Sequence, residues 1–520
     1  MRLVAQIHVA GSRLSIRSWG IPLARRTASA SQTSEKSCRS FNTATASTET
    51  HASLDPSSTT SPTSRLLELA ATITRETAVL DRVIKESGSP VPSFDVDGPP
   101  NFPKLGEEVK RAREELLRAT KELGDLVTGP TERVRWMAWD VRSPPKNEVR
   151  SRTTTHSLYT PSTITGLVSP SSPREQRSGS RVPPAQSFPI RATTTFAEIA
   201  SKVGLSELNV RRFLRHAMTN RIFKEVSPGV VAHTAASRVL AEDGMMNDWV
   251  GFCVEDMWPA ASQTIPAIKR NPAADDMSQT GFCLANNTTD IEPMFATFGK
   301  SPVRAKRMGG AMVSLTGGEG YELAYLLDNY DWASLDAAGA RLVDIGGSHG
   351  FVSIALAERY PHMHFTVQDL PRTIASAPPV PPSLRPRITF QAHDFNTPQP
   401  VQSADVYLFR WILHNNSDKY ATNMLRQLIP ALKRGARVVI NDHCLPEPGA
   451  EGEWDERVMR TMDLVMLTLL NAQERTEGEF RELFAKVDPR FRFLGARRVA
   501  GCRMSIVEAV WEGEDFGAES

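Results

Sequence analysis

The sequence predicts an α/β domain in its C-terminal half, preceded by a mainly helical region with a winged-helix arrangement. From Arg341 onwards, apolar strands alternate with helical segments, which is typical of a parallel sheet covered by helices on both faces. A helix, turn, helix and hairpin pattern lies between residues 195 and 233. The chain has 520 residues, 40% of them hydrophobic, and is therefore long enough for two or more domains.

The N-terminus and one internal interval lack the pattern of a packed core. Residues 1–63 are rich in Ser and Thr with few large apolar side chains, so we expect a disordered leader. The arginines and absent acids of residues 1–34 also fit a mitochondrial transit peptide, and both interpretations stay open. Residues 141–190 are rich in Ser, Thr and Pro, which predicts a disordered insertion or translated non-coding sequence.

Residues 64–140 are expected to be a helical segment. Apolar residues recur at helical spacing over 66–84 and again over 109–126. Gly129 and Pro130 form a stop signal after the second helix. Because these helices carry apolar stripes and no cluster of reactive groups, we expect them to serve packing or dimerisation.

Residues 191–320 are expected to form the winged helix and helices of a substrate pocket. Thr195 and Glu198 form a capping box that begins its first helix. The predicted order is helix 196–203, a helix from 206, strand 222–226 and strand 230–233. Arg211, Arg212 and Arg215 on the second helix would suit DNA recognition. The low net charge instead favours a dimerisation or lid module.

The catalytic domain is expected over residues 321–520. Its predicted strands cover 341–345, 364–368, 387–392, 405–409, 436–441, 491–499 and 504–511, with helices over 351–359 and around 423–432. In such sheets ligands bind beyond the carboxyl ends of the strands.

Composition limits the classes of partner. The chain has 61 Lys and Arg against 59 Asp and Glu, and the net charge of +2 gives no general basis for nucleic-acid binding. Its five Cys are far apart, which argues against a disulfide scaffold or a zinc site and suits a reducing, cytoplasmic compartment. No apolar run reaches 18 residues, so we expect no membrane span.

Three acids follow three successive predicted strands. Asp344 precedes a glycine-rich turn, where it could meet an ammonium, and Asp369 is placed to accept hydrogen bonds from both ribose hydroxyls. Asp394 is placed to reach an adenine amino group. A nucleoside that carries an amino acid is S-adenosylmethionine. A nicotinamide cofactor is disfavoured by Asp344, and by Ser348 at a position where GxGxxG has glycine.

At this point the chain resembles the plant and fungal small-molecule O-methyltransferases, and in particular the fungal branch that includes sterigmatocystin O-methyltransferase. The matching strings are LVDIGGSHG, FTVQDLP, HDF, FRWILHNNSD, DHCLPEPG and NAQERTEGEF. The resemblance implies a winged-helix dimerisation domain, a Rossmann-like seven-stranded catalytic domain, a homodimer and S-adenosylmethionine as cofactor. It implies no metal, no nucleic acid and no membrane partner.

The resemblance also assigns roles by position. Gly346 and Gly347 would line the methionine part of the cofactor and Asp369 the ribose. Asp394 with Phe395 would contact the adenine, and Arg410 the amino-acid side.

His414 matches the catalytic base of this family, and Asp442 and Glu474 match the two acids that orient it. The chemistry agrees, because an imidazole with a pKa near 6.5 can take a phenolic proton at neutral pH. An acid on its other nitrogen fixes the tautomer. The predicted reaction is methyl transfer to a hydroxyl of a small aromatic or polyketide-like molecule, in secondary metabolism.

An apolar pocket over His414 would hold a flat aromatic acceptor. The candidates are one tryptophan and four methionines: Trp258, Met308, Met312, Met462 and Met466. Each of these side chains could instead be an ordinary residue of the hydrophobic core. The interval 141–190 interrupts a region that is helical in the family, so an alternative is an inactive relative that acts as a dimerising or regulatory winged-helix protein.

Overall fold

A computed structural model describes residues 64–94, 98–99, 101–139 and 183–514. The chain divides into two compact units between Val127 and Thr128. The leader predicted over 1–63 and residues 141–182 of the predicted insertion lie outside the described residues.

The first unit contains α1 (Arg65–Ser87) and α2 (Gly106–Thr128), which confirms the two predicted helices. Ser64 caps α1, and Gly88 ends it in the left-handed conformation. Its core is small, with six buried apolar side chains: Leu69, Leu80, Ile84, Val109, Ala112 and Ala119. Leu80, Val109 and Ala112 form one cluster at the contact of the two helices. Several large apolar side chains remain exposed: Leu66, Leu67, Leu117, Leu126 and Val127.

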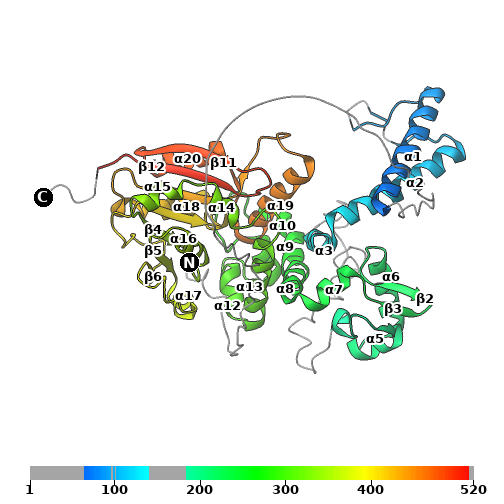
Figure 1. Cartoon of the computed structure of the whole chain (residues 1–520), viewed down its shortest axis with the longest axis horizontal. Helices are drawn as coiled ribbons and strands as arrows, with labels where there is room; N and C mark the ends of the chain where they lie inside the picture. The colour runs from blue at the N-terminus through cyan, green and yellow to red at the C-terminus, as the bar shows by residue number, and fades with distance from the viewer. Residues whose placement is uncertain (1–63, 95–97, 100, 140–182, 515–520) are drawn as a thin grey trace, which may run out of the picture. The chain divides into compact units, whose positions relative to one another are not determined.

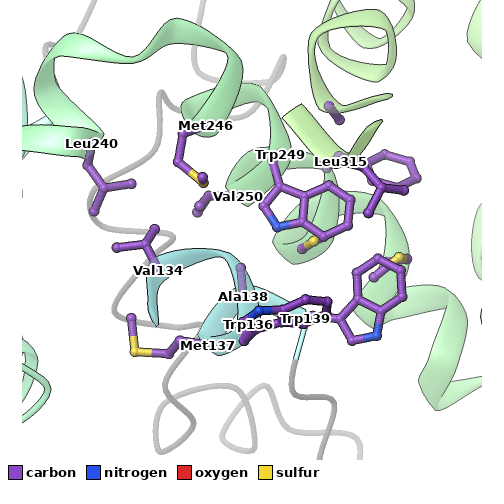
Figure 2. Close-up of a cluster of buried hydrophobic side chains, with 14 of the residues drawn as sticks. Val134, Trp136, Met137, Ala138, Trp139, Leu240, Met246, Trp249, Val250 and Leu315 are labelled. Carbon is purple, nitrogen blue, oxygen red and sulfur yellow. The ribbon is translucent and has the colours of Figure 1, made fainter. Parts of the chain in front are cut away.

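A third helix, α3 (Pro130–Trp139), belongs to the second unit, so the predicted segment 64–140 is not one piece. Figure 2 shows α3 against Trp249, whose ring stacks on Trp139 with centroids 4.9 Å apart. The Trp249 Nε1–H donates to the Arg135 carbonyl at 3.2 Å. Sequence reasoning missed α3 because its last six residues are all buried, which leaves no amphipathic periodicity.

The helices and strands predicted between residues 195 and 233 are present in the predicted order. The elements of this region are β1 (Thr193–Thr195), α5 (Phe196–Val203), α6 (Glu207–Met218), β2 (Lys224–Ser227) and β3 (Val230–Ala232). The three strands form an antiparallel sheet in the order β1-β3-β2. The predicted capping box begins α5, with Thr195 and Glu198 bonded reciprocally. Arg215 is paired with Glu225 of β2 at 2.8 Å.

The packed region begins before residue 191, so the predicted end of the insertion at 190 is wrong. A short 3₁₀ turn, Pro184–Gln186, is followed by Phe188, which is buried. The Phe188 ring lies 4.2 Å from the ring of His233, and its carbonyl lies 3.3 Å from His233 Nε2. Proline and serine dominate this stretch, and burial of one aromatic ring cannot be read from composition.

A helical layer connects the predicted winged helix to the sheet. It contains α7 (Ala235–Glu242), α8 (Gly244–Phe252), a π-helix (Cys253–Met257), α9 (Trp258–Ser262), α10 (Thr264–Arg270), α11 (Gly281–Asn286), α12 (Met294–Gly299) and α13 (Pro302–Thr316). Figure 1 shows α8 and α13 side by side. Arg304 of α13 donates to Asp256 of the π-helix at 2.6 Å, an ion pair that joins these helices.

The C-terminal part of the chain is built on a seven-stranded sheet in the order β11-β12-β8-β7-β4-β5-β6. The strands are β4 (Arg341–Ile345), β5 (His364–Asp369), β6 (Ile388–Ala392), β7 (Val406–Arg410), β8 (Arg437–Asp442), β11 (Phe491–Arg498) and β12 (Ser505–Trp511). β4 to β8 are parallel, whereas β12 and β11 return antiparallel. The predicted strands and their closing hairpin are confirmed to within about a residue at each end.

Helices flank the sheet: α14 (Ala324–Asp328), α15 (Trp332–Ala337), α16 (Phe351–Arg359), α17 (Pro371–Ser376), α18 (Asp418–Arg426) and α20 (Glu477–Val487). The long helix α19 (Glu453–Leu470) packs against α9 and α11 of the helical layer. The helix predicted around 423–432 instead begins at Asp418, after the N-cap residue Ser417. It ends at Arg426, before the separate 3₁₀ turn that contains Pro430. A short parallel pair, β9 (Cys444–Leu445) and β10 (Arg475–Thr476), lies beside the main sheet.

Candidate active site

The glycine-rich turn after β4 has little room for side chains. Gly346 has φ +70, and a Cβ there would lie 2.6 Å from Ile412 Cδ1. At Gly347 a Cβ would lie 2.5 Å from Asp344 Cγ, because that carboxyl group lies directly against the turn. Packing therefore favours glycine at both positions, and the left-handed backbone conformation favours it at Gly346 as well.

A cavity of about 190 Å³ opens beside this turn. Four of the predicted cofactor residues line it together: Gly346, Asp369, Asp394 and Phe395. The rest of its wall includes residues that sequence reasoning missed: Asp276, Met277, Pro293, Phe295, Asn416 and Tyr420. Since several of these come from irregular loops of the helical layer, no periodic pattern marks them.

The two acids in the cavity are held by neighbouring amides. The oxygens of Asp369 accept from the backbone N–H groups of Ser348 at 3.0 Å and Leu370 at 2.7 Å. Burial raises the pKa of Asp369. Asp394 accepts from the backbone N–H of Asn396 at 3.0 Å. Both carboxylates are thus fixed at the ends of adjacent parallel strands, and each oxygen retains acceptor capacity for a ligand.

Three predicted cofactor residues do not line this cavity: Gly347, Asp344 and Arg410. Asp344 is buried, accepts from the Ser353 hydroxyl at 2.8 Å, and has its pKa raised to about 6 by burial. It supports the turn from within. Arg410 turns away from the cavity, bonds to Asn441 and donates to the Tyr321 carbonyl at 3.1 Å. Burial lowers the pKa of Arg410 to about 10.

His414 lies in a short 3₁₀ turn, Leu413–Asn415, that follows β7, and it is buried. Its Nδ1 lies 2.9 Å from Glu474 Oε1. A carboxylate only accepts, so Nδ1 carries the proton and the Nε2 lone pair remains available as a base. Burial disfavours the imidazolium, but the charge and hydrogen bond of Glu474, together with the charge of Asp442, outweigh it and raise the pKa of His414.

The two predicted orienting acids have different roles. Glu474 binds the imidazole ring, as expected, and the nearby imidazoles outweigh burial to lower its pKa to about 2. Asp442 at the end of β8 instead accepts from the backbone N–H of His414 at 3.1 Å. It therefore fixes the main chain of the 3₁₀ turn rather than the ring. Burial raises the pKa of Asp442.

Four of the five predicted pocket residues belong to one apolar cluster. Met308, Met462 and Met466 are buried in it and Met312 packs against it, as does Trp411. The Trp411 ring lies 5.0 Å from that of His414, so this cluster reaches the imidazole. Trp258 begins α9 and is half-buried, and its Nε1–H has no hydrogen-bond partner among the described residues.

Two kinds of feature are absent from the residues that the structure describes. No group of three or more His, Cys, Asp or Glu side chains is arranged there to hold a metal ion. No helix there is long and apolar enough to cross a membrane.

Comparison with known proteins places the chain in a family. Residues 311–488 match the O-methyltransferase domain family. The chain is 47% identical over 457 residues to a chlorophenol O-methyltransferase of Trichoderma longibrachiatum, covering 87% of this chain and 92% of that protein. The chain belongs to the fungal S-adenosylmethionine-dependent O-methyltransferases. It is also 36% identical over 459 residues to O-methyltransferase pyvH of Aspergillus violaceofuscus, covering 86% and 99% of the two chains.

Solved structures agree on the fold of this O-methyltransferase. The crystal structure of OxaC aligns with a TM-score of 0.57 at 21% identity, covering 86% of this chain and all of OxaC. The structure of a LepI complex with SAM aligns with a TM-score of 0.53 at 21% identity, covering 85% and 100%. This confirms the Rossmann-like fold with a helical N-terminal region. S-adenosylmethionine is the methyl donor of this enzyme, and the acids, ring and glycine that line the cavity fit a nucleoside.

Proposed function

We propose that this O-methyltransferase methylates the hydroxyl of a small phenol, with His414 as the general base. The observation that carries the proposal is the bond from His414 Nδ1–H to Glu474, which leaves Nε2 able to accept a proton. The class of acceptor comes from the 47% identical relative, whose name assigns it chlorophenols. A phenol has an ordinary pKa near 10, so a base increases the fraction that reacts at neutral pH.

Bound S-adenosylmethionine supplies an electrophilic methyl group on a sulfonium sulfur. In the proposed arrangement, Asp369 accepts from the ribose hydroxyls, while Asp394 and Phe395 contact the adenine. Gly346 allows the close approach of the cofactor to the backbone. His414 Nε2 removes the phenolic proton as the oxygen becomes nucleophilic, and Glu474 stabilises the imidazolium that results. Alignment of oxygen and methyl supplies the rest of the acceleration.

The acceptor would lie against the methionine side of the apolar cluster. Met308, Met462 and Met466 present adaptable side chains, and Trp411 brings an aromatic face beside His414. A neutral aromatic ring is held there by burial of apolar area and by stacking, with the base as the main polar contact.

A homodimer is part of the same proposal. The unit of α1 and α2 buries six apolar side chains, three of which form a contiguous cluster, but leaves others exposed, Leu66 and Leu117 among them. So small a core rarely supports an independent fold. A second copy of the chain would cover these side chains. Sedimentation equilibrium of the full-length protein tests this, and a monomer at micromolar concentration would contradict it.

The experiment for the base uses acceptors of graded acidity. His414→Ala should lower kcat about 10²- to 10⁴-fold on a weakly acidic phenol, the usual contribution of a general base. The loss should shrink for heavily chlorinated phenols, which are already ionised at neutral pH. Affinity for S-adenosylhomocysteine, measured by calorimetry, should stay within a few fold. His362→Ala, at an exposed position, is the matched control.

A loss that does not depend on acceptor acidity would contradict a role as base. Equal loss of cofactor affinity and turnover would place His414 in the cofactor site instead. Asp369→Ala should show the reverse pattern, with cofactor affinity weakened by about 1–3 kcal/mol, the cost of unsatisfied polar partners.

A further inference from the structure

A second buried histidine shares the carboxylate that holds His414. His443 follows Asp442 directly and is 0% exposed. Its Nδ1 lies 3.2 Å from Glu474 Oε1, the same oxygen that His414 Nδ1 approaches at 2.9 Å. The other oxygen, Oε2, is buried and has no hydrogen-bond partner among the described residues. Both imidazoles therefore compete for the lone pairs of one atom.

The pairing of two short strands brings His443 and Glu474 together. The strands β9 and β10 run parallel, with Cys444 opposite Arg475, so the preceding residues His443 and Glu474 lie side by side. On its other side, His443 Nε2 lies 3.3 Å from the hydroxyl of Tyr321. Tyr321 is itself held through its carbonyl, which accepts from Arg410 at 3.1 Å. The position of His443 is thus fixed from both ends.

The chemistry of these groups sets the direction of their hydrogen bonds. Glu474 only accepts, so both histidines donate to it from Nδ1–H. In the neutral form of His443 the lone pair is on Nε2, and this nitrogen accepts from the Tyr321 hydroxyl. Burial raises the pKa of Tyr321 above its usual range, so the phenol keeps its proton. The result is a chain of donors that runs from Tyr321 through His443 to Glu474.

We propose that His443, supported by Tyr321, is a positioning residue that limits how strongly Glu474 holds the protonated form of His414. This inference rests on the proposed role of His414 as the base. A carboxylate oxygen that accepts a second N–H has less electron density for the first. His443 thus keeps the affinity of His414 for a proton in the range where it can accept one and release it again.

Other charges face His414, and the substitutions below leave them in place. Asp442 accepts from its backbone N–H. The Arg475 guanidinium donates to the Leu413 carbonyl at 3.1 Å and is paired with Asp418 at 3.0 Å. From α19, Asp463 accepts from the backbone N–H of Glu474 at 2.9 Å, which fixes the main chain that presents the carboxylate.

The test is the pH dependence of kcat/KM on a weakly acidic phenol. Loss of turnover at low pH reports protonation of the base, and this acidic limb moves with the pKa of His414. His443→Leu removes the second donor, so Glu474 binds the His414 imidazolium more strongly. We expect the acidic limb to move about half a unit to one unit to higher pH, the equivalent of one net hydrogen bond.

Two further variants separate this role from simple packing. His443→Asn can keep an N–H near the position of Nδ1 and should show less than half of that shift. Tyr321→Phe keeps the ring packing on Trp411, which has centroids 5.4 Å apart, but removes the hydroxyl that polarises His443. It should give a smaller shift in the same direction. These two variants decide the matter if His443→Leu does not fold.

The inference would be overturned if the acidic limb stayed within about 0.2 pH units of its wild-type position in both His443→Leu and Tyr321→Phe, since this is about the precision of such profiles. A fall in kcat or in the melting temperature would not change that conclusion. A shift as large in His443→Asn as in His443→Leu would also overturn it, because the donor would then be irrelevant. Failure of the proposed function is distinguishable. In that case the wild-type enzyme has no acidic limb that disappears in His414→Ala.

Discussion

Replacing Glu474 by Gln removes the charge that holds His414 while keeping the size of the side chain. In the wild-type protein, burial of His414 disfavours the imidazolium and the Glu474 carboxylate overcomes this. The raised pKa means that kcat/KM falls as the pH drops through it, because the imidazolium cannot accept a proton. With Gln at this position burial prevails, and the acidic limb moves to lower pH.

The size of the shift follows from the hydrogen bond at 2.9 Å between His414 Nδ1 and Glu474 Oε1. Hydrogen bonds to a charged group contribute about 1.5–3 kcal/mol and neutral ones about 0.5–1.5 kcal/mol. The difference of about 1–1.5 kcal/mol corresponds to about one pH unit. Plateau kcat should fall about tenfold or more, because the imidazole is less basic and an amide no longer imposes one tautomer.

The assay is a pH profile of kcat/KM on a weakly acidic phenol, with Glu482→Gln as control. Glu482 lies on the exposed face of α20, so its substitution should leave the profile unchanged. An acidic limb that stays in place or moves to higher pH in Glu474→Gln would refute the reasoning. The acidic limb is expected to move to lower pH in Glu474→Gln and to higher pH in His443→Leu. The two variants therefore test the same electrostatic explanation through shifts in opposite directions.

Two further predictions concern folding. Gly347→Ala should destabilise the protein by about 1–3 kcal/mol in thermal unfolding and weaken S-adenosylhomocysteine binding, because its Cβ would lie 2.5 Å from Asp344 Cγ. Gly478→Ala has its nearest neighbour at 3.9 Å and should be harmless, so equal effects would contradict this. Trp139→Ala should cost about 3–5 kcal/mol in denaturant unfolding, because Trp139 is buried and stacks on Trp249. A loss below about 1 kcal/mol would show that α3 is not part of the folded core.

The sequence by itself determined the parts of the fold that depend on local pattern. Short apolar runs between helical segments placed the strands at 341–345 and 364–368, and the capping box placed the start of α5 after Thr195. Such features arise from hydrogen bonds and burial periodicity within a few residues, so they can be predicted directly from the amino-acid sequence. The family resemblance also predicted that Glu474 orients His414, and the two side chains lie 2.9 Å apart.

Tertiary structure alone decided how distant segments meet. The side chain of Arg410 turns towards Asn441 and Tyr321, although its strand ends beside the cavity. Asp442 binds the backbone of His414 rather than its ring. These outcomes depend on rotamers and on the space that neighbouring elements leave, and neither is encoded by residue spacing.

The two histidines that contact Glu474 show most clearly what cannot be predicted from the sequence alone. His414, His443, Glu474 and Tyr321 are separated by tens of residues in most pairs, and they meet because β9 pairs with β10 beside the end of β8. One carboxylate oxygen can serve two donors only when three chain segments converge within hydrogen-bond distance. That convergence is a property of the packed protein, since no single segment of the sequence contains it.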